Sequence, residues 1–316
     1  MTQASRDTDD LLHAAWLYHV GRMSQEEVSR SLGISRFKVL RLLAEARETG
    51  LVRVTLEHET TGTLDLADQV AQTFGLIEAQ VAPMPRPLDD AYARQAVGIV
   101  AARFLARIGR EGAMSIGVGW GRTMAAMAQS VTGLRNPQLC FVSLMGATAR
   151  AAVTSPFDVC TRLAALTGGT AMFLPAPFLT DSEEDCRMVL KQRLVRETLA
   201  AARAAPYCII GLGDCSAGAL LSTSGILTDA ETASFAALGA VADSTGKFFR
   251  DDGSLADTDL NRRTPSIGLE DLRRADVTLL AAGAEKTRAT RAVLRSGIVN
   301  RLIADEGLAR ALLVIA

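Results

Sequence analysis

Four glycine-containing segments beyond residue 114 could hold an anion or a polyol. They are Gly117-Val-Gly119-Trp-Gly121-Arg-Thr123, Met145-Gly146-Ala147, Gly211-Leu-Gly213-Asp214 and Ala282-Gly283-Ala-Glu-Lys286. Glycine lets backbone amides approach a ligand closely, and the N-terminus of a following helix favours negative charge. Arg122, Thr123 and Lys286 stand where helices are expected to begin. We therefore interpret the first and last segments as cradles for a phosphate or a hydroxyl.

The elements that must position these segments are short apolar runs, each of a length typical of a buried parallel strand. The runs cover residues 114–118, 139–145, 171–174, 207–212 and 277–282, with 301–304 as a weaker candidate. Amphipathic stretches of helical length separate them, which predicts an α/β domain with a mainly parallel sheet covered on both faces. Ligands bind such sheets beyond the carboxyl ends of the strands, so all four segments should open on one edge. The predicted ligand-binding residues in them are Gly119, Gly121, Arg122, Thr123, Gly146, Gly213, Gly283 and Lys286.

The same residue patterns exclude several kinds of chemistry. The first segment lacks the Gly-x-Gly-x-x-Gly order, and no Gly-x-x-x-x-Gly-Lys-Ser/Thr occurs, so we expect no nucleotide cofactor. The five cysteines form no Cys-x-x-Cys pair, which argues against a zinc knuckle or a redox dithiol. All three histidines precede residue 60, so the large domain has no histidine base or metal ligand. We expect no cofactor, no metal and no catalytic residue.

Residues 1–57 carry the pattern of a helix-turn-helix. Ser24 and Glu27 form a capping box that opens a short helix to about Leu32. Gly33 then supplies the turn, and Ser35 caps a second helix that lasts to about Thr49. A first helix lies upstream, whose aromatic residues, Trp16 and Tyr18, are expected to close the small core. Residues 51–56 alternate like a strand and predict a short wing.

The second helix of this pair separates an apolar face from a basic one. A buried stripe is predicted for Val39, Leu42, Leu43 and Ala46. Its outer face and N-terminus carry the side chains suited to a DNA groove, which are Ser35, Arg36, Phe37, Lys38 and Arg41. Residues 30–53 hold six basic and two acidic residues, a local charge of +4 in a chain whose net charge is -1. DNA binding is the favoured interpretation, and contact with a partner helix is the alternative for Phe37.

The chain therefore divides into a DNA-binding domain at residues 1–57 and a larger α/β domain at residues 58–316, which is expected to bind an effector and to oligomerise. Residues 60–65 are interpreted as a linker and residues 83–87 as a loop. No window approaches the roughly 18 apolar residues of a membrane span, and the first thirty residues show no secretory leader. We expect a cytoplasmic protein with no membrane partner.

Taken together, these segments resemble the SorC family of bacterial sugar-operon regulators. The resemblance covers residues 17–54, Gly117–Thr123, Leu166-Thr-Gly-Gly169, Leu174-Pro-Ala-Pro177, Gly239-Ala-Val-Ala-Asp243, Phe248-Phe249 with Gly253, Gly283–Lys286 and residues 299–306. Three positions depart from the family pattern. Ala242 replaces a glycine, Arg250 replaces an aspartate, and Met145-Gly-Ala147 replaces Asn-Gly-Gly.

The resemblance implies an effector domain with the fold of the glucosamine-phosphate deaminase and ribose-phosphate isomerase group, used as a sensor. It further implies a homodimer or homotetramer that binds operator DNA near carbohydrate or polyol catabolic genes and responds to a phosphorylated sugar or polyol. Carried onto this chain, the phosphate would lie against Gly121, Arg122 and Thr123 and against Gly283 and Lys286, with Asp243 facing the hydroxyls. The first helix, with Ala15-Trp-Leu-Tyr18, resembles regulators of polyol operons such as erythritol.

Two other functions stay open at this point. One is a sugar-phosphate isomerase or deaminase with a helical appendage, in which Asp214, Asp243 and Glu285 would be the candidate carboxylates. The absence of any histidine after residue 58 disfavours it. The other is a DNA-binding protein that responds to no ligand, which the sequence does not exclude.

Overall fold

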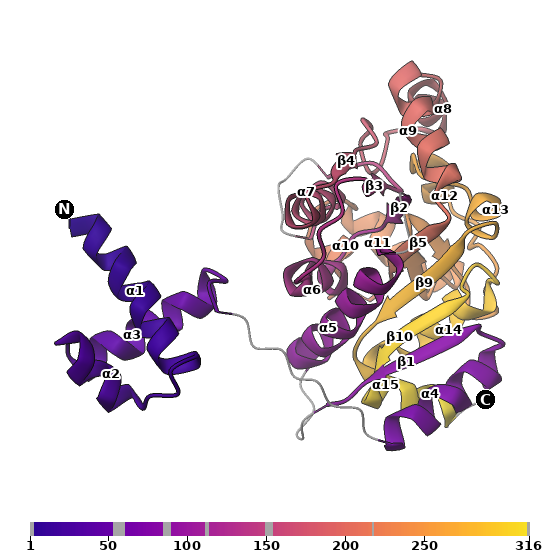
Figure 1. Cartoon of the computed structure of the whole chain (residues 1–316). Helices are drawn as coiled ribbons and strands as arrows, with labels where there is room; N and C mark the ends of the chain where they lie inside the picture. The colour runs from indigo at the N-terminus through magenta and orange to yellow at the C-terminus, as the bar shows by residue number, and fades with distance from the viewer. Residues whose placement is uncertain are drawn as a thin grey trace. The chain divides into compact units, whose positions relative to one another are not determined.

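The computed structural model describes residues 3–52, 61–84, 90–110, 114–148, 154–216 and 218–314. The chain divides into two compact units, Met1–Glu57 and His58–Ala316, both drawn in Figure 1. Among the helices in these ranges, none has the length and apolar character needed to cross a lipid bilayer.

The smaller unit is a three-helix head built from α1 (Gln3–His19), α2 (Gln25–Leu32) and α3 (Arg36–Glu48). The predicted capping box is confirmed, since the Glu27 amide donates to Ser24 Oγ and the Ser24 amide donates to Glu27 Oε2. Gly33 ends α2 in the left-handed conformation, with φ 64°. The predicted stripe of α3 is buried, and Val39, Leu42 and Leu43 pack against Ala14 of α1 and Val28 of α2.

Two details of the head differ from the prediction or lie beyond what is described. Tyr18 packs against the head core, but Trp16 is 58 % exposed, so the prediction that Trp16 closes the core is wrong. Ala14 and Ala15 occupy the inward face of α1, and the helical period turns Trp16 outward. Leu51 and Val52 form a bend, and the rest of the predicted wing, residues 53–56, lies outside the described residues.

The larger unit is built on a seven-stranded sheet whose neighbouring strands all run parallel. Its spatial order is β1 (Glu78–Ala82), β10 (Arg301–Asp305), β9 (Asp276–Ala281), β5 (Tyr207–Gly211), β2 (Ser115–Val118), β3 (Cys140–Ser143) and β4 (Thr170–Met172). Every predicted run overlaps one of these strands, including the weaker candidate at 301–304. The predicted mainly parallel α/β fold is confirmed, and β1 is an addition to it.

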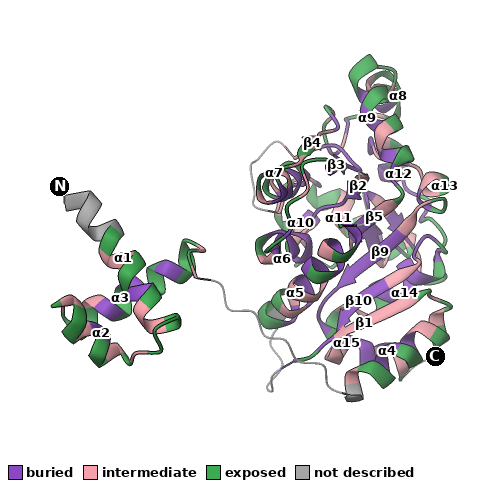
Figure 2. Cartoon of the chain, viewed as in Figure 1, coloured by how far each residue is buried: buried purple, intermediate pink, exposed green. Residues whose placement is uncertain are grey.

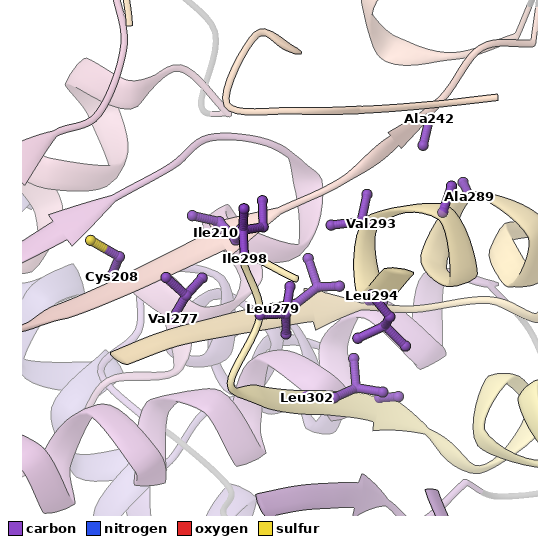
Figure 3. Packing of buried hydrophobic residues seen from close by; sticks show 14 of the residues in the cluster. Cys208, Ile210, Ala242, Val277, Leu279, Ala289, Val293, Leu294, Ile298 and Leu302 are labelled. Carbon is purple, nitrogen blue, oxygen red and sulfur yellow. The ribbon is translucent and has the colours of Figure 1, made fainter. Parts of the chain in front are cut away.

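Helices cover both faces of the sheet because side chains alternate along each strand. In β5, Ile209 points into the layer formed with α5, α6 and α7, whereas Cys208 and Ile210 point into the layer formed with α4, α9, α14 and α15. Figure 2 shows the buried strands between helices whose outer sides are exposed. Figure 3 shows the second layer, where Val277 and Leu279 of β9 face Val293 of α14.

The helices of this unit vary from single turns to nineteen residues. They are α4 (Thr61–Phe74), α5 (Asp90–Ile108), α6 (Arg122–Ser130), α7 (Pro156–Thr167), α8 (Glu183–Leu190), α9 (Arg193–Ala204), α10 (Leu220–Thr223), α11 (Asp229–Leu238), α12 (Leu260–Arg263), α13 (Leu269–Leu272), the 3-10 turn η1 (Ala284–Lys286), α14 (Thr287–Arg295) and α15 (Glu306–Leu313). The linker expected at 60–65 is wrong from residue 61 onward, because α4 begins there and is held by the buried Leu66 and Val70. Of the loop expected at 83–87, Pro83 and Met84 are irregular and the rest lies outside the described residues.

A small antiparallel sheet was not predicted. It consists of β6 (Gly213–Asp214), β7 (Ala242–Ser244) and β8 (Lys247–Phe249), in that spatial order. Its register places Gly213 opposite Asp243. This sheet therefore brings a predicted glycine next to a predicted carboxylate.

The order of the large sheet reverses between β2 and β5. From β2 the chain proceeds outward through β3 to β4, whereas from β5 it proceeds the other way through β9 to β10. At such a switch point the two connecting loops diverge and leave a crevice beyond the carboxyl ends of the strands. The fold thus provides a crevice where β2 and β5 end.

Candidate functional site

A pocket occupies this crevice at the ends of β2 and β5. It has about 510 Å³ of empty space, which includes open solvent. Its lining residues are Trp120, Gly121, Arg122, Thr123, Gly211, Leu212, Gly213, Asp214, Leu220, Leu221, Asp243 and Lys286. The structure thus brings together six of the nine predicted effector-binding residues, which are Gly121, Arg122, Thr123, Gly213, Asp243 and Lys286.

The other three predicted residues, Gly119, Gly146 and Gly283, do not line this pocket, and their amides are bonded within the protein. Gly119 donates to the Ile209 carbonyl at 2.9 Å, and Gly146 donates to the Pro265 carbonyl at 3.1 Å. A Cβ at Gly146 would lie 2.1 Å from the Pro177 carbonyl oxygen, so glycine is required there for backbone packing. These two residues have an evident role in holding strands and loops together.

Gly283 has its own intramolecular partner. Its amide donates to Asp305 Oδ2 at 2.7 Å, and Asp305 Oδ1 accepts from the amides of Gly307 and Leu308 at the start of α15. Asp305 is 2 % exposed, so this carboxylate is a buried link between the Gly283 loop and α15. The prediction that the Gly283 amide cradles a phosphate is corrected, since Asp305 already accepts its hydrogen bond.

The first pocket wall is the loop from Gly121 into α6. Gly121 has φ 118°, a conformation that favours glycine, and its backbone carbonyl accepts the bond from Ala125 that opens the helix. Thr123 is 7 % exposed, while Arg122 is exposed. Within the described residues, the Arg122 guanidinium forms no hydrogen bond or ion pair. A cation, a hydroxyl and a helix N-terminus therefore share one side of the pocket.

The second wall carries Asp243 and Lys286. Burial raises the pKa of Asp243 to about 7, while the charge of Lys286 lowers this pKa and that of Asp214 raises it. Lys286 Nζ donates to the Leu212 carbonyl at 3.3 Å. Burial also lowers the pKa of Lys286, against the opposing effect of Asp214. A buried carboxyl and a half-buried ammonium thus influence each other at the pocket.

Asp214 differs from Asp243 in its protonation. Burial raises the pKa of Asp214, but hydrogen bonds from Ser216 and the charge of Lys286 outweigh this effect, so its pKa is lowered. Asp214 is therefore ionised at neutral pH, whereas Asp243 gains or loses its proton near neutral pH. Such a pair can both accept hydrogen bonds from ligand hydroxyls and donate one to them.

The predicted effector-binding set left out several lining residues. Asp214 follows the predicted Gly213 in the same segment, but it was named only as a candidate carboxylate of the enzyme alternative. Trp120 lies within the first glycine segment and packs against Phe178, with ring centroids 5.1 Å apart. Leu220 and Leu221 belong to α10, a segment in which the sequence analysis recognised no motif. The family departures at Ala242, Arg250 and Met145 do not line the pocket, and the Arg250 side chain donates to the Leu238 carbonyl instead.

In the head, the predicted DNA contacts gather around the first turn of α3. Ser35 caps the helix by accepting from the Lys38 amide at 3.2 Å. Phe37 is 84 % exposed, and Arg36 and Arg41 are exposed as well. We call these three residues the reading face. Lys38 is engaged within the head, since its Nζ lies 2.6 Å from Asp10 Oδ2.

A metal centre is not formed by the described residues, in which no group of three or more His, Cys, Asp and Glu side chains could hold a metal ion. All five cysteines are free. Burial raises the pKa of Cys208 to about 12, so this thiol is a core residue rather than a nucleophile.

Comparison with known proteins identifies the larger unit. Residues 58–314 match the family model described as "Putative sugar-binding domain". The whole chain is 36 % identical to the erythritol catabolism regulatory protein EryD of Brucella abortus (strain 2308), over 97 % of this chain and 98 % of EryD. The transcriptional regulator LsrR of Klebsiella pneumoniae is 29 % identical over 96 % of this chain and 92 % of its own. EryD and LsrR are both named as regulators, which confirms a regulator over the isomerase or deaminase alternative.

Solved structures agree with this assignment. A sugar-binding domain of a transcriptional repressor from Vibrio fischeri is 27 % identical and covers 79 % of this chain and 98 % of its own, with a TM-score of 0.72. The full-length sorbitol operon regulator SorC from Klebsiella pneumoniae, 23 % identical, shares the fold over 96 % of this chain and 97 % of its own, with a TM-score of 0.74. The chain belongs to the SorC family of transcriptional regulators with a sugar-binding domain.

Proposed function

We propose that this protein is a cytoplasmic regulator of a carbohydrate or polyol catabolic operon, controlled by a phosphorylated sugar or polyol that binds at the ends of β2 and β5. One observation carries the effector proposal. The pocket joins an arginine that has no hydrogen-bond or ion-pair partner among the described residues, a threonine at a helix N-terminus and a lysine to two carboxyl groups. An anionic group with adjacent hydroxyls is the ligand that complements this set.

The phosphate end of the effector is assigned to Gly121, Arg122, Thr123 and Lys286. An exposed guanidinium can bind two phosphate oxygens in a bidentate manner, and the α6 N-terminus adds amide donors. Lys286 supplies a second positive charge at the same pocket. Because its carbonyl partner, Leu212, is neutral, Lys286 can donate to a phosphate without breaking an ion pair.

The hydroxyl end is assigned to Asp243 and Asp214, next to Gly213. The 36 % identical EryD is named for erythritol catabolism, so a four-carbon polyol phosphate is the first effector to test. Trp120, Leu220 and Leu221 supply the apolar part of the lining. A small ligand whose carbon chain lies against them would place its phosphate near Arg122 and Lys286 and its hydroxyls near Asp243 and Asp214.

Operator DNA is assigned to the head. The reading face presents two guanidinium groups for guanine edges or phosphates, and Phe37 for a thymine methyl. Ser35 caps the helix that carries them, and Lys38 contributes charge near its N-terminus while bound to Asp10.

Effector binding and DNA binding are linked through the oligomer, proposed as a homodimer or homotetramer. If the effector favours one arrangement of the subunits, that arrangement sets the spacing of two heads on the operator half-sites. A coupling of about 1–3 kcal/mol would change operator affinity about 5- to 150-fold.

A thermal-shift panel tests the effector proposal. Erythritol, sorbitol and ribose, each with and without a terminal phosphate, are compared on the full chain. A bound compound at 100 times its dissociation constant should stabilise the larger unit by about 2.7 kcal/mol, and only phosphorylated compounds should do so. Stabilisation by the unphosphorylated compounds alone would contradict the phosphate assignment, and no shift with any compound would contradict the sensor assignment.

A further inference from the structure

The helix α3 carries a second apolar stripe in addition to the buried one. It consists of Phe37, Leu40 and Ala44, which are all exposed, Phe37 to 84 % and Leu40 to 43 %. Residues spaced by three, four and seven positions lie together on one helix face, so these side chains adjoin one another. We call these three residues the α3 stripe. In the described part of the head, none of them belongs to the apolar core.

The packing of the head does not explain the α3 stripe. The inner side of α3 already closes the head core through Val39, Leu42 and Leu43. A single exposed leucine or alanine is ordinary on a protein surface, but a phenylalanine exposed to this extent beside two further apolar residues is typical of a binding surface. The α3 stripe is therefore interpreted as a surface that another molecule covers.

Two arginines border the α3 stripe and indicate what covers it. At about 100° per residue, Leu40, Ala44 and Phe37 span about 60° of the helix circumference. Arg36 lies about 40° beyond Leu40 on one side, and Arg41 lies about 40° beyond the phenylalanine on the other. Both arginines are exposed, and neither guanidinium forms a hydrogen bond or an ion pair within the described residues. An apolar strip between two available positive charges complements a polyanion that has apolar groups between its charged borders.

The major groove of DNA has this arrangement. It is about 12 Å wide and admits one helix, with the base edges on its floor and the phosphates of the two strands along its borders. Among the four bases, only thymine presents an apolar group on this floor, its C5 methyl. The side chains of the α3 stripe have no hydrogen-bonding group with which to read any other base edge. When the α3 stripe faces the floor, Arg36 and Arg41 are turned toward the two borders.

We propose that the α3 stripe reads the methyl groups of thymines, so that each operator half-site contains adjacent A·T pairs that are recognised by apolar contact. The inference rests on the proposed function, because it takes the head to be the DNA-binding unit. It deepens that function in two respects. Leu40 and Ala44 join Phe37 in the contact with DNA, and the class of base sequence that the head recognises is specified.

Deoxyuridine tests the methyl contact directly. A pool of random-sequence duplexes is enriched for binding to the full chain, and the selected duplex is then synthesised once with thymine and once with deoxyuridine. Deoxyuridine pairs with adenine in the same way and lacks only the C5 methyl. Affinity should fall about fourfold for each contacted methyl, as for the loss of one buried CH₂ group. Equal affinities for the two duplexes, or selected half-sites without A·T pairs, would overturn the proposal.

Variants of the full chain test whether the α3 stripe makes this contact. Phe37→Ala should weaken binding to the thymine duplex and lower the ratio of the two affinities several-fold, because the apolar partner of the methyl is lost. Its melting temperature should stay unchanged, since Phe37 is exposed. Arg41→Ala is the matched control, because it also shortens an exposed side chain of α3 but removes no apolar contact. Arg41→Ala should weaken binding to both duplexes equally. An unchanged ratio in Phe37→Ala would overturn the assignment to the α3 stripe.

The enrichment step separates this inference from the proposed function. If the unaltered chain enriches no sequence from the pool, the DNA-binding assignment fails, and the methyl contact fails with it. If the chain enriches a sequence that it binds equally with thymine and with deoxyuridine, the methyl contact fails and the DNA-binding assignment stands. A protein partner is then the favoured occupant of the α3 stripe.

Discussion

The carboxyl group of Asp243 lies against the backbone of Gly213. A Cβ at residue 213 would come within 2.1 Å of Asp243 Oδ1, and the two residues face each other in the register of β6 and β7. Gly213 therefore determines where the carboxyl group sits. Because Gly213 has no side chain, the Asp243 carboxyl group can lie directly against the backbone of β6.

The first prediction is that Gly213→Ala lowers effector affinity by moving the Asp243 carboxyl. Loss of one hydrogen bond to a charged group costs about 1.5–3 kcal/mol, so the dissociation constant measured by calorimetry should rise at least about tenfold. Gly218→Ala is the matched control, because a Cβ at residue 218 meets no atom within 4 Å. Equal affinities of the two variants would place the effector away from Asp243.

The second prediction concerns the pH dependence of stability. Burial raises the folded-state pKa of Asp243 to about 7, whereas an unfolded aspartate titrates near 3.9. Between these values the folded chain holds a proton that the unfolded chain has lost. The contribution of Asp243 to stability is therefore complete below about pH 4 and is lost as pH rises through about 7. Asp243→Asn should remove this decline.

Melting temperatures of the ligand-free chain at pH 5 and pH 8 measure this effect. The melting temperature of Asp243→Asn minus that of the unaltered chain should be larger at pH 8 than at pH 5. Asp257→Asn is the control, because the Asp257 side chain is 86 % exposed. A difference between Asp243→Asn and the unaltered chain that is the same at both pH values would show that Asp243 is ionised throughout.

The third prediction separates effector binding from DNA binding. Arg122→Ala and Lys286→Ala should each abolish most of the thermal shift caused by a phosphorylated effector, because each removes a charge-assisted hydrogen bond. Operator affinity without effector should stay unchanged. Arg135→Ala is a matched control, since Arg135 is exposed and does not line the pocket. Loss of operator binding in Lys286→Ala would mean that Lys286 supports the fold.

The fourth prediction concerns the reading face. Arg41→Ala should weaken operator binding by about 1–3 kcal/mol if Arg41 reads a base, with no loss of stability, because Arg41 is exposed. Arg41→Lys keeps the charge but loses the bidentate geometry, so it should restore a phosphate contact but not a base contact. Titrations at several salt concentrations distinguish the two. Unchanged affinity in Arg41→Ala would move the reading surface elsewhere.

The parts of the fold that sequence could predict are those with strong local patterns. The central strands are continuous apolar runs, because a parallel sheet with helices on both faces buries both sides of each strand. β1 was not predicted because it is a half-buried edge strand in which Glu78 and Gln80 interrupt the apolar pattern. β6, β7 and β8 were not predicted because segments of two or three residues carry no measurable periodicity.

The candidate site was harder to predict because a glycine has several uses. Gly121 and Gly283 both have positive φ and both precede a helical turn, so their sequences look alike. What separates them is a distant partner, since Asp305 accepts the Gly283 hydrogen bond. Likewise, the period of α1 puts Trp16 on its outer side, but only the packed head shows that its core closes without the tryptophan.

The buried link at Asp305 has a mechanical consequence. Its carboxylate joins the loop before Lys286 to the first turn of α15, and α15 shares one hydrophobic cluster with Leu66 and Val70 of α4. α4 is also the first described helix after residues 53–60, through which the chain arrives from the head. The wall of the pocket that carries Lys286 is therefore joined to α4 in two steps, first by the hydrogen bonds of Asp305 and then by the apolar packing of α15.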